Sequence, residues 1–423
     1  MLATEIYTHR IPEVYSQFSH AVGDGVWKKR VYRCRQEIKG NEFLKDYLRE
    51  ENDLAFQFEH LRLISEQYGY VPLAETRNRN IYPAVAFATQ VLSIMASVET
   101  SEADKICRRV RGAFSNPDDM RGLRLELAAA THFSRIGRHV SWPETTGIGT
   151  FDLLVEKERQ PSLEVECKSI GKDKGRRIHR REIIDFCLIL KPYLKSTTTG
   201  LQRGLSVVVT IPDRLPRGHR ERVDFAKVLG QAIFAGKNCC LPDGSTVRID
   251  DFDISALGNL PNLSERERRT LIDKVSSTSN RSAIFIGTPV GGLLALTIQS
   301  TRDDMLFPYT FDTLSDAAKR QLTGSRAGML FVCFEGLSAD QLLSIAGQDQ
   351  DPSQKPTYLR VAVSKFLSSK ERAHLVGTGF VSASVLRPEA HGVVESAGVS
   401  YYFPKQESPF WHDAFSGMFN WAR

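Results

Sequence analysis

The stretch Leu163-Glu164-Val165-Glu166-Cys167-Lys168 decides how the middle of this chain folds. Side chains alternate along a β-strand, so one face of this stretch would take the apolar or small residues and the other the charged ones. The apolar face holds Leu163, Val165 and Cys167, and the charged face holds Glu164, Glu166 and Lys168. The pattern predicts a strand within a sheet that lines up two carboxylates and an amine.

A second carboxylate-bearing strand precedes it. Asp152 lies between Phe151 and Leu153 in an apolar run that reaches Glu156. A carboxylate in such a run needs a polar partner, because burying it alone is costly. A hairpin through residues 157–161 would bring Asp152 close to Glu166.

A helix before these strands supplies a further acid. Asn116-Pro117-Asp118-Asp119 combines a helix-capping residue, a proline suited to the first turn and two acids, and Gly137 suits the helix end. On that helix Glu126 falls within an apolar stripe made by Leu123, Leu127, Ala130 and Phe133. Its spacing predicts that Glu126 points at the sheet.

Three acids and a lysine at one sheet edge suit phosphodiester hydrolysis assisted by a divalent metal ion. Mg²⁺ prefers oxygen ligands and often takes one or two carboxylates, the rest being waters and substrate phosphate. We expect Asp152, Glu166 and the backbone carbonyl of Cys167 to hold Mg²⁺, for which Mn²⁺ would substitute. Lys168 would orient or help deprotonate the attacking water. Glu126 would bind a second metal ion or a metal-bound water.

These residues resemble the PD-(D/E)xK nuclease superfamily, which includes restriction endonucleases. The match is Thr150-Phe151-Asp152, a spacer of thirteen residues and Glu166-Cys167-Lys168, preceded by the helix with Glu126. Thr150-Phe151 stands where the motif has a proline, a position that varies among members. The resemblance implies that Asp152, Glu166 and Lys168 are the catalytic trio and Glu126 an accessory helix acid. It also implies a restriction-endonuclease-like αβββαβ core.

The fold class expected is therefore α/β with three regions. Residues 1–115 should form a helical N-terminal region, with helices near 27–68, 82–98 and 101–114. Residues 116–215 should form the nuclease core: the helix, strands near 138–142, 151–156 and 162–170, a helix near 177–195 and a strand near 205–211. Residues 216–423 should form a mixed α/β region. Its expected strands include 329–334, 358–363 and 377–385, with a helix at 314–322 and a short helix at 410–421.

A basic segment follows the catalytic strand and would open the next helix. Its candidate nucleic-acid-binding residues are Lys172, Lys174, Arg176, Arg177, Arg180 and Arg181. Contacts between such residues and phosphates give sequence-independent affinity. Taken alone the segment is more typical of a solvated helix face, but its position beside the proposed metal site favours the binding role.

The composition fits a protein of a reducing compartment. The 423-residue chain has a formal net charge of +6, which permits a polyanionic partner without requiring one. Its seven cysteines include no CxxC pair, which disfavours zinc sites and disulfides. No apolar segment resembles a signal peptide, and Ala84–Val98 reads as a buried helix rather than a membrane span. We expect a cytoplasmic protein with no membrane partner.

The function expected is that of a Mg²⁺-dependent endonuclease, with DNA expected over RNA as substrate. Analogy with other stand-alone nucleases points to antiviral defence. Two rival hypotheses stay open: a catalytically silent nucleic-acid-binding module, and an assembly protein that oligomerises through residues 27–68. Glu164 is equally open as a further metal-site carboxylate or as a solvent-side neighbour of Glu166.

Overall fold

A computed structural model describes residues 5–255, 257, 263–276, 278–382, 385–388 and 392–419. Contacts divide the chain into two units: the first comprises Met1–Cys34, Glu51–Lys172 and Tyr309–Arg423, and the second comprises Arg35–Glu50 and Asp173–Pro308. The predicted boundaries at residues 115 and 215 do not coincide with these units. The difference arises because the N-terminal helices share a core with the sheet, whereas residues 173–308 build a sheet of their own.

The first unit contains most of the predicted N-terminal helices. They are α1 (Ile11–Val22), α4 (Asp53–Tyr68), α5 (Tyr82–Ser97), α6 (Thr100–Ala113) and α7 (Pro117–Arg135). Helix α2 (Gly25–Gly40) begins in this unit and ends in the second, and α3 (Leu44–Glu51) lies in the second unit except for its last residue. Helix α6 begins at Thr100, with Glu99 at its cap position. Aromatic rings of Phe18, Trp27, Phe58, Phe87 and Phe114 stack or meet edge to face in the core.

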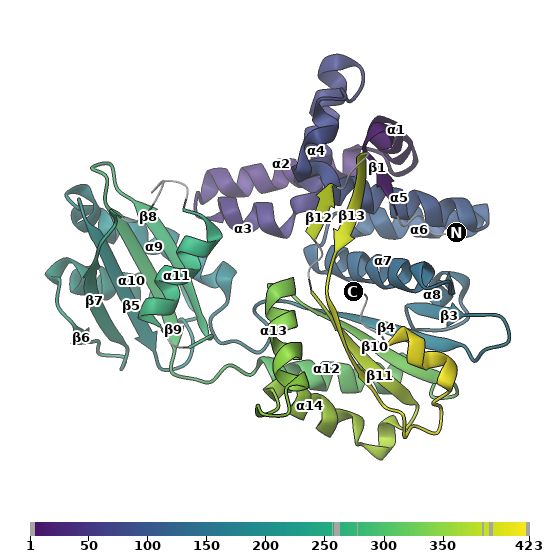
Figure 1. Ribbon diagram of the computed structural model, residues 1–423. Coiled ribbons are helices and arrows are strands. Elements are labelled where there is room, and N and C mark those ends of the chain that lie inside the picture. Colours follow the sequence, from purple (N-terminus) through teal and green to yellow (C-terminus); the bar gives the residue numbers. More distant parts are fainter. Residues whose placement is uncertain are drawn as a thin grey trace. The chain divides into compact units, whose positions relative to one another are not determined.

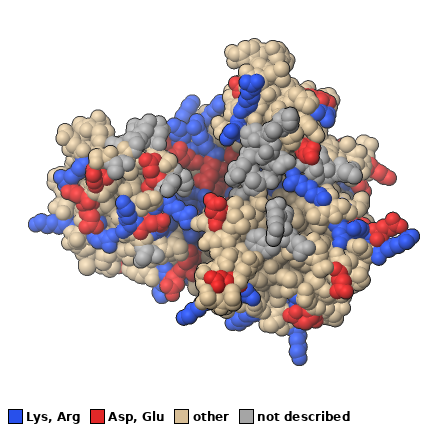
Figure 2. Space-filling model, viewed as in Figure 1, with Lys and Arg blue, Asp and Glu red and all other residues tan. Residues whose placement is uncertain are grey.

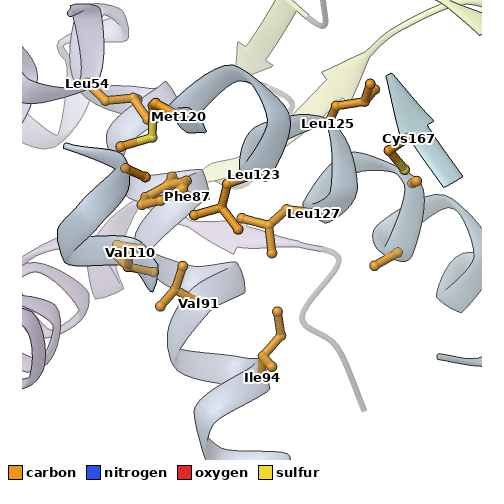
Figure 3. Close-up of a cluster of buried hydrophobic side chains, with 14 of the residues drawn as sticks. Leu54, Phe87, Val91, Ile94, Val110, Met120, Leu123, Leu125, Leu127 and Cys167 are labelled. Carbon is orange, nitrogen blue, oxygen red and sulfur yellow. The ribbon is translucent and has the colours of Figure 1, made fainter. Parts of the chain in front are cut away.

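Helix α7 joins this helical core to the sheet. Its buried Leu123 and Leu127 lie in one cluster with Val91 of α5 and Val110 of α6 (Figure 3). The same cluster includes Cys167 from the predicted catalytic strand. Burial of this apolar surface holds α7 against the strand that carries the candidate site.

The sheet of the first unit has six strands in the order β14-β11-β10-β4-β3-β2. Their bounds are β2 (His139–Ser141), β3 (Leu153–Glu156), β4 (Leu163–Ile170), β10 (Ala327–Phe334), β11 (Leu375–Val381) and β14 (Ser400–Pro404). Strands β2, β3 and β4 are antiparallel neighbours, whereas β10 is parallel to both β4 and β11. Helix α7 lies on one side of this sheet, with α12 (Leu306–Arg320) and α14 (Tyr358–Leu367) on the other (Figure 1).

The predicted helix and three strands of the core are confirmed as α7, β2, β3 and β4. The helix predicted near 177–195 and the strand predicted near 205–211 are also present. The next helix and strand, α9 (Arg180–Thr199) and β5 (Gly204–Ile211), belong to the second unit. Beside β4 lies β10 instead, with Ala327 opposite Leu163 and Phe334 opposite Ile170. The partner strand thus comes from more than 150 residues later in the chain.

The second unit has a five-stranded sheet in the order β6-β7-β5-β9-β8. Its elements are α9, β5, α10 (His219–Ala235), β6 (Cys239–Cys240), β7 (Thr246–Phe252), α11 (Glu265–Val275), β8 (Arg281–Gly287) and β9 (Leu293–Ser300). Strand β5 is parallel to β9 and antiparallel to β7. Both β5 and β9 are almost wholly buried, which explains their continuous apolar sequences.

Smaller elements complete the first unit. These are α8 (Pro143–Thr146), α13 (Ala339–Gln350) and a sheet of β1 (Ile6–Tyr7), β13 (Val393–Ala397) and β12 (Val385–Pro388). The predicted strand at 358–363 is wrong: it is the start of α14, where the Thr357 side chain caps the helix. The expected tail helix is a short 3-10 helix at Asp413–Met418, and residues 420–423 lie outside the described residues. In the described part of the chain, no helix combines the length and apolar character that crossing a bilayer requires.

Candidate active site

Glu126 is held inside the protein by helix α7. The Asn116 side chain accepts a hydrogen bond from the Asp118 amide at 3.1 Å, as the capping sequence predicts. From that start the helical repeat turns Glu126 inward with Leu123 and Leu127, and its exposed fraction is 4 %. The predicted inward orientation of this acid is confirmed.

An arginine that the sequence reading missed neutralises part of this charge. Arg109 of α6 places its guanidinium 2.5 Å from Glu126 Oε1 and 3.7 Å from Glu144. The signal was present in the spacing, because Arg109 follows the buried Ile106 by three residues and precedes the buried Ala113 by four. An arginine at such a position on an otherwise apolar helix face calls for an acidic partner.

Asp152 is placed beside the catalytic strand. Its carboxylate accepts a hydrogen bond from the backbone amide of Cys167 at 2.8 Å. Leu153 pairs with Val165 in the antiparallel register, and continuing that register by one residue sets Asp152 opposite Glu166. The hairpin expected from the sequence therefore brings these two acids together.

Lys168 forms a direct ion pair with Glu166 on the same strand. Its Nζ lies 2.6 Å from Glu166 Oε1, as expected for side chains two residues apart on one strand face. The Glu166 side chain is 1 % exposed and that of Lys168 is 23 % exposed. The acid is thus buried, whereas the lysine side chain is partly exposed.

Asp152 is the charge that both glutamates share. Burial and the charge of Asp152 raise the pKa of Glu126, and the same two causes raise the pKa of Glu166. Burial also raises the pKa of Asp152, although the Cys167 amide and the Lys168 charge oppose that shift. Crowded, desolvated carboxylates favour protonation unless a cation joins them.

Comparisons of the chain with protein-family models, curated proteins and solved structures find no match. The candidate site therefore rests on the residues and their geometry.

Two observations make the acid cluster suitable for a cation. Glu126 Oε2 and Glu166 Oε2 are buried, and neither has a hydrogen-bond partner among the described residues. Buried carboxylate oxygens are costly without a donor or a metal ion. Within the described ranges, no three His, Cys, Asp or Glu side chains gather closely enough to hold a metal ion. The set expected from the sequence also included Glu126, and such a group of three acids is not found in these ranges. Asp152 and Glu166, with the Cys167 carbonyl, stay a prediction for a single ion.

Glu164 has a separate structural role. It is fully buried, and its carboxylate accepts hydrogen bonds from the amide of Thr323 at 2.8 Å and from the Thr323 hydroxyl at 2.7 Å. Arg326 lies 3.7 Å away. Glu164 thus fixes the turn between α12 and β10. The alternative that Glu164 is a solvent-side neighbour of Glu166 is wrong, because its side chain is buried.

The predicted basic segment is largely neutralised within the protein. Arg176, Arg177, Arg180 and Arg181 form ion pairs with Asp304, Asp213, Glu50 and Glu37, respectively. Lys172 ends the first unit, where its charge acts on Glu335. Lys174 is half-buried. A purely solvated helix face does not describe these four arginines either, because their ion pairs connect different elements of the second unit.

Proposed function

We propose that the protein is a metal-dependent nuclease that hydrolyses phosphodiester bonds, with DNA as the expected substrate. The observation that carries the proposal is the convergence of Asp152, Glu166 and Lys168 where β3 meets β4. Glu126 approaches the same Asp152 charge from α7. Buried acids with unpartnered oxygens, beside a partly exposed lysine side chain, form an arrangement suited to a cation and a phosphate.

The order of elements supports the proposal. Helix α7 is followed by β2, β3 and β4, and α12 and β10 then add a strand parallel to β4. We infer that α12 and β10 complete the αβββαβ order that the resemblance implies, in place of the helix and strand expected at 177–195 and 205–211, with residues 173–308 as an insertion. An insertion between core elements leaves the site intact, because Asp152, Glu166 and Lys168 all precede it.

Each residue has a role that follows from its position. A bound Mg²⁺ or Mn²⁺ would polarise the phosphate and lower the pKa of a bound water. Asp152 and Glu166, with the Cys167 carbonyl, would hold the ion. Lys168 would release its ion pair with Glu166 and direct its amine at the attacking water or the developing phosphate charge. Glu126, freed from Arg109, would orient a further water.

The proposal is tested by incubating the purified full-length chain with plasmid, single-stranded DNA and RNA. We expect cleavage with Mg²⁺ or Mn²⁺ and none with chelator. The Asp152→Asn variant keeps the size of the side chain, removes the charge common to the site and should not cleave. Nucleic-acid binding without cleavage under every metal would support the silent module instead, and neither binding nor cleavage would leave an assembly role.

Metal binding should also show in thermal stability, with a definite pH dependence. The pKa is raised to about 7 for Glu166 and to about 8 for Glu126. Acids with raised pKa values favour the folded state when protonated, and that contribution is lost as pH rises through these values. We therefore expect Mg²⁺ to raise the unfolding temperature more at pH 8.5 than at pH 6, because ionised carboxylates bind it without losing protons.

Differential scanning fluorimetry at both pH values measures this shift, and Asp152→Asn serves as the matched control. An equal Mg²⁺ shift at the two pH values, or an undiminished shift in the variant, would contradict binding at these carboxylates.

A further inference from the structure

Helix α2 carries a concentration of positive charge that the proposed site does not use. Six of its sixteen residues are Lys or Arg, and five of these are exposed: Lys28, Lys29, Arg33, Arg35 and Lys39. No described carboxylate lies within ion-pair distance of any of the five. In Figure 2, Lys and Arg side chains lie next to Asp and Glu side chains in the upper middle of the molecule. The five basic side chains of α2 thus carry positive charge that no described carboxylate pairs with directly.

Glu37 near the end of α2 and the acids that follow the helix are engaged in other ion pairs. Glu37 and Glu42 pair with Arg181 and Lys191 of α9, and Asp46 of α3 pairs with Arg268. Glu50 pairs with Arg180, and Glu51 with Arg121. These five acids therefore pair with basic residues outside α2, and none of them pairs with the exposed Lys and Arg side chains of α2.

An aromatic ring interrupts the basic surface. Tyr32 is 63 % exposed and lies one helical turn from Lys28 and Lys29. Exposed aromatic rings between cationic groups are typical of surfaces that bind single-stranded nucleic acid. There the phosphates contact Lys and Arg side chains, and the nucleobases stack on the aromatic ring.

A membrane surface is a poorer partner for this helix. An amphipathic helix binds a bilayer through its apolar face. The apolar face of α2 consists of Trp27, Val31 and Cys34, and all three are fully buried in the protein. Only the charged face is free to meet a ligand.

We propose that Lys28, Lys29, Tyr32 and Arg33 form a binding surface for single-stranded nucleic acid. This surface would take the role that the sequence reading gave to residues 172–181, whose arginines are committed to ion pairs. The inference rests on the proposed function for the role of this binding, namely to hold the substrate. The binding itself does not require cleavage.

The test compares two triple variants of the full-length chain in chelator, so that nothing is cleaved. K28E/K29E/R33E reverses the charge of the proposed surface, and K355E/K365E/K370E reverses three exposed lysines elsewhere in the first unit. Both take the formal net charge from +6 to zero. Binding of a fluorescent 30-nucleotide single strand is measured by anisotropy at several salt concentrations, after circular dichroism has verified folding.

We expect K28E/K29E/R33E to weaken binding at least 30-fold and to lower the slope of log affinity against log salt by about two. Tyr32→Ala should weaken binding about tenfold without changing that slope. The control triple variant should bind within about threefold of the original protein. Equal losses in the two triple variants, or tighter binding to anionic vesicles than to the oligonucleotide, would overturn the proposal. Loss of α2-dependent binding with cleavage intact would leave the nuclease proposal standing.

Discussion

Replacing Lys168 with methionine is expected to lower the single-turnover cleavage rate about a thousandfold at saturating Mg²⁺. Methionine keeps the length and apolar stem of the side chain and removes the amine. That amine lies 2.6 Å from Glu166 and carries the cationic charge of the trio. Without it, the buried Glu166 loses its ion-pair partner, and developing negative charge on the phosphate loses a stabilising group.

Glu164→Gln is the matched control for this variant. Glu164 lies on the same strand and the same face as Lys168, but its carboxylate is occupied by Thr323. Cleavage by Glu164→Gln should stay within a few-fold of the original rate, while Lys168→Met still binds the oligonucleotide in chelator. A Lys168→Met variant that cleaves normally would remove the lysine from the mechanism.

The sequence was sufficient for the local geometry of the candidate site. Alternation along β4, the apolar run around Asp152 and the helical stripe around Glu126 each depend on neighbours within a few residues, and all three orientations appear in the structure. Such short-range periodicity is what a single sequence encodes most directly. The orientations of these side chains are therefore predictable without knowledge of the elements that surround them.

The strand beside β4 could not be found in the same way. Residues 177–211 have the helix-then-strand pattern that completes the expected core, but they form α9 and β5 of another sheet. The sequence predicts β10, the actual neighbour, as a strand, but it does not indicate that this strand pairs with β4. Strand pairing over long sequence separations depends on tertiary packing, which propensity and periodicity do not report.

Helix α14 shows a second limit. Residues 358–363 include Tyr358, Val361 and Val363, which favour a strand by type. The Thr357 side chain accepts a hydrogen bond from Arg360 N, and Leu359, Val363 and Phe366 are buried with helical spacing. Capping and tertiary burial thus override a weak local preference.

Replacing Arg109 with alanine is expected to lower the free energy of unfolding by about 2 to 3 kcal/mol at pH 9. The variant leaves Glu126, whose side chain is 5 % exposed, without the guanidinium that lies 2.5 Å away. We place the loss at the lower end for a broken buried pair, because Arg109 is itself 34 % exposed. Urea denaturation in chelator measures it.

The loss should shrink at pH 6. Burial already raises the pKa of Glu126, and removal of Arg109 takes away a group that lowers it. At pH 6 the Glu126 carboxyl is protonated in the folded variant and needs no counter-charge. At pH 9 it must either ionise while buried or keep a proton at a pH above its pKa in the unfolded chain, and both cost stability. A loss independent of pH would show that Arg109 acts through packing alone.

Two further variants isolate the pair. Arg108→Ala changes the neighbouring exposed arginine of α6 and should cost under about 0.5 kcal/mol. R109A/E126Q removes both charges, so it should recover stability relative to Arg109→Ala at pH 9, and the part of the pH dependence that comes from Glu126 should disappear. Mg²⁺ should stabilise Arg109→Ala more than the original protein, because the ion then supplies the positive charge that Arg109 otherwise provides to the acid cluster. If the double variant is as unstable as Arg109→Ala at pH 9, the arginine is not the counter-ion of Glu126.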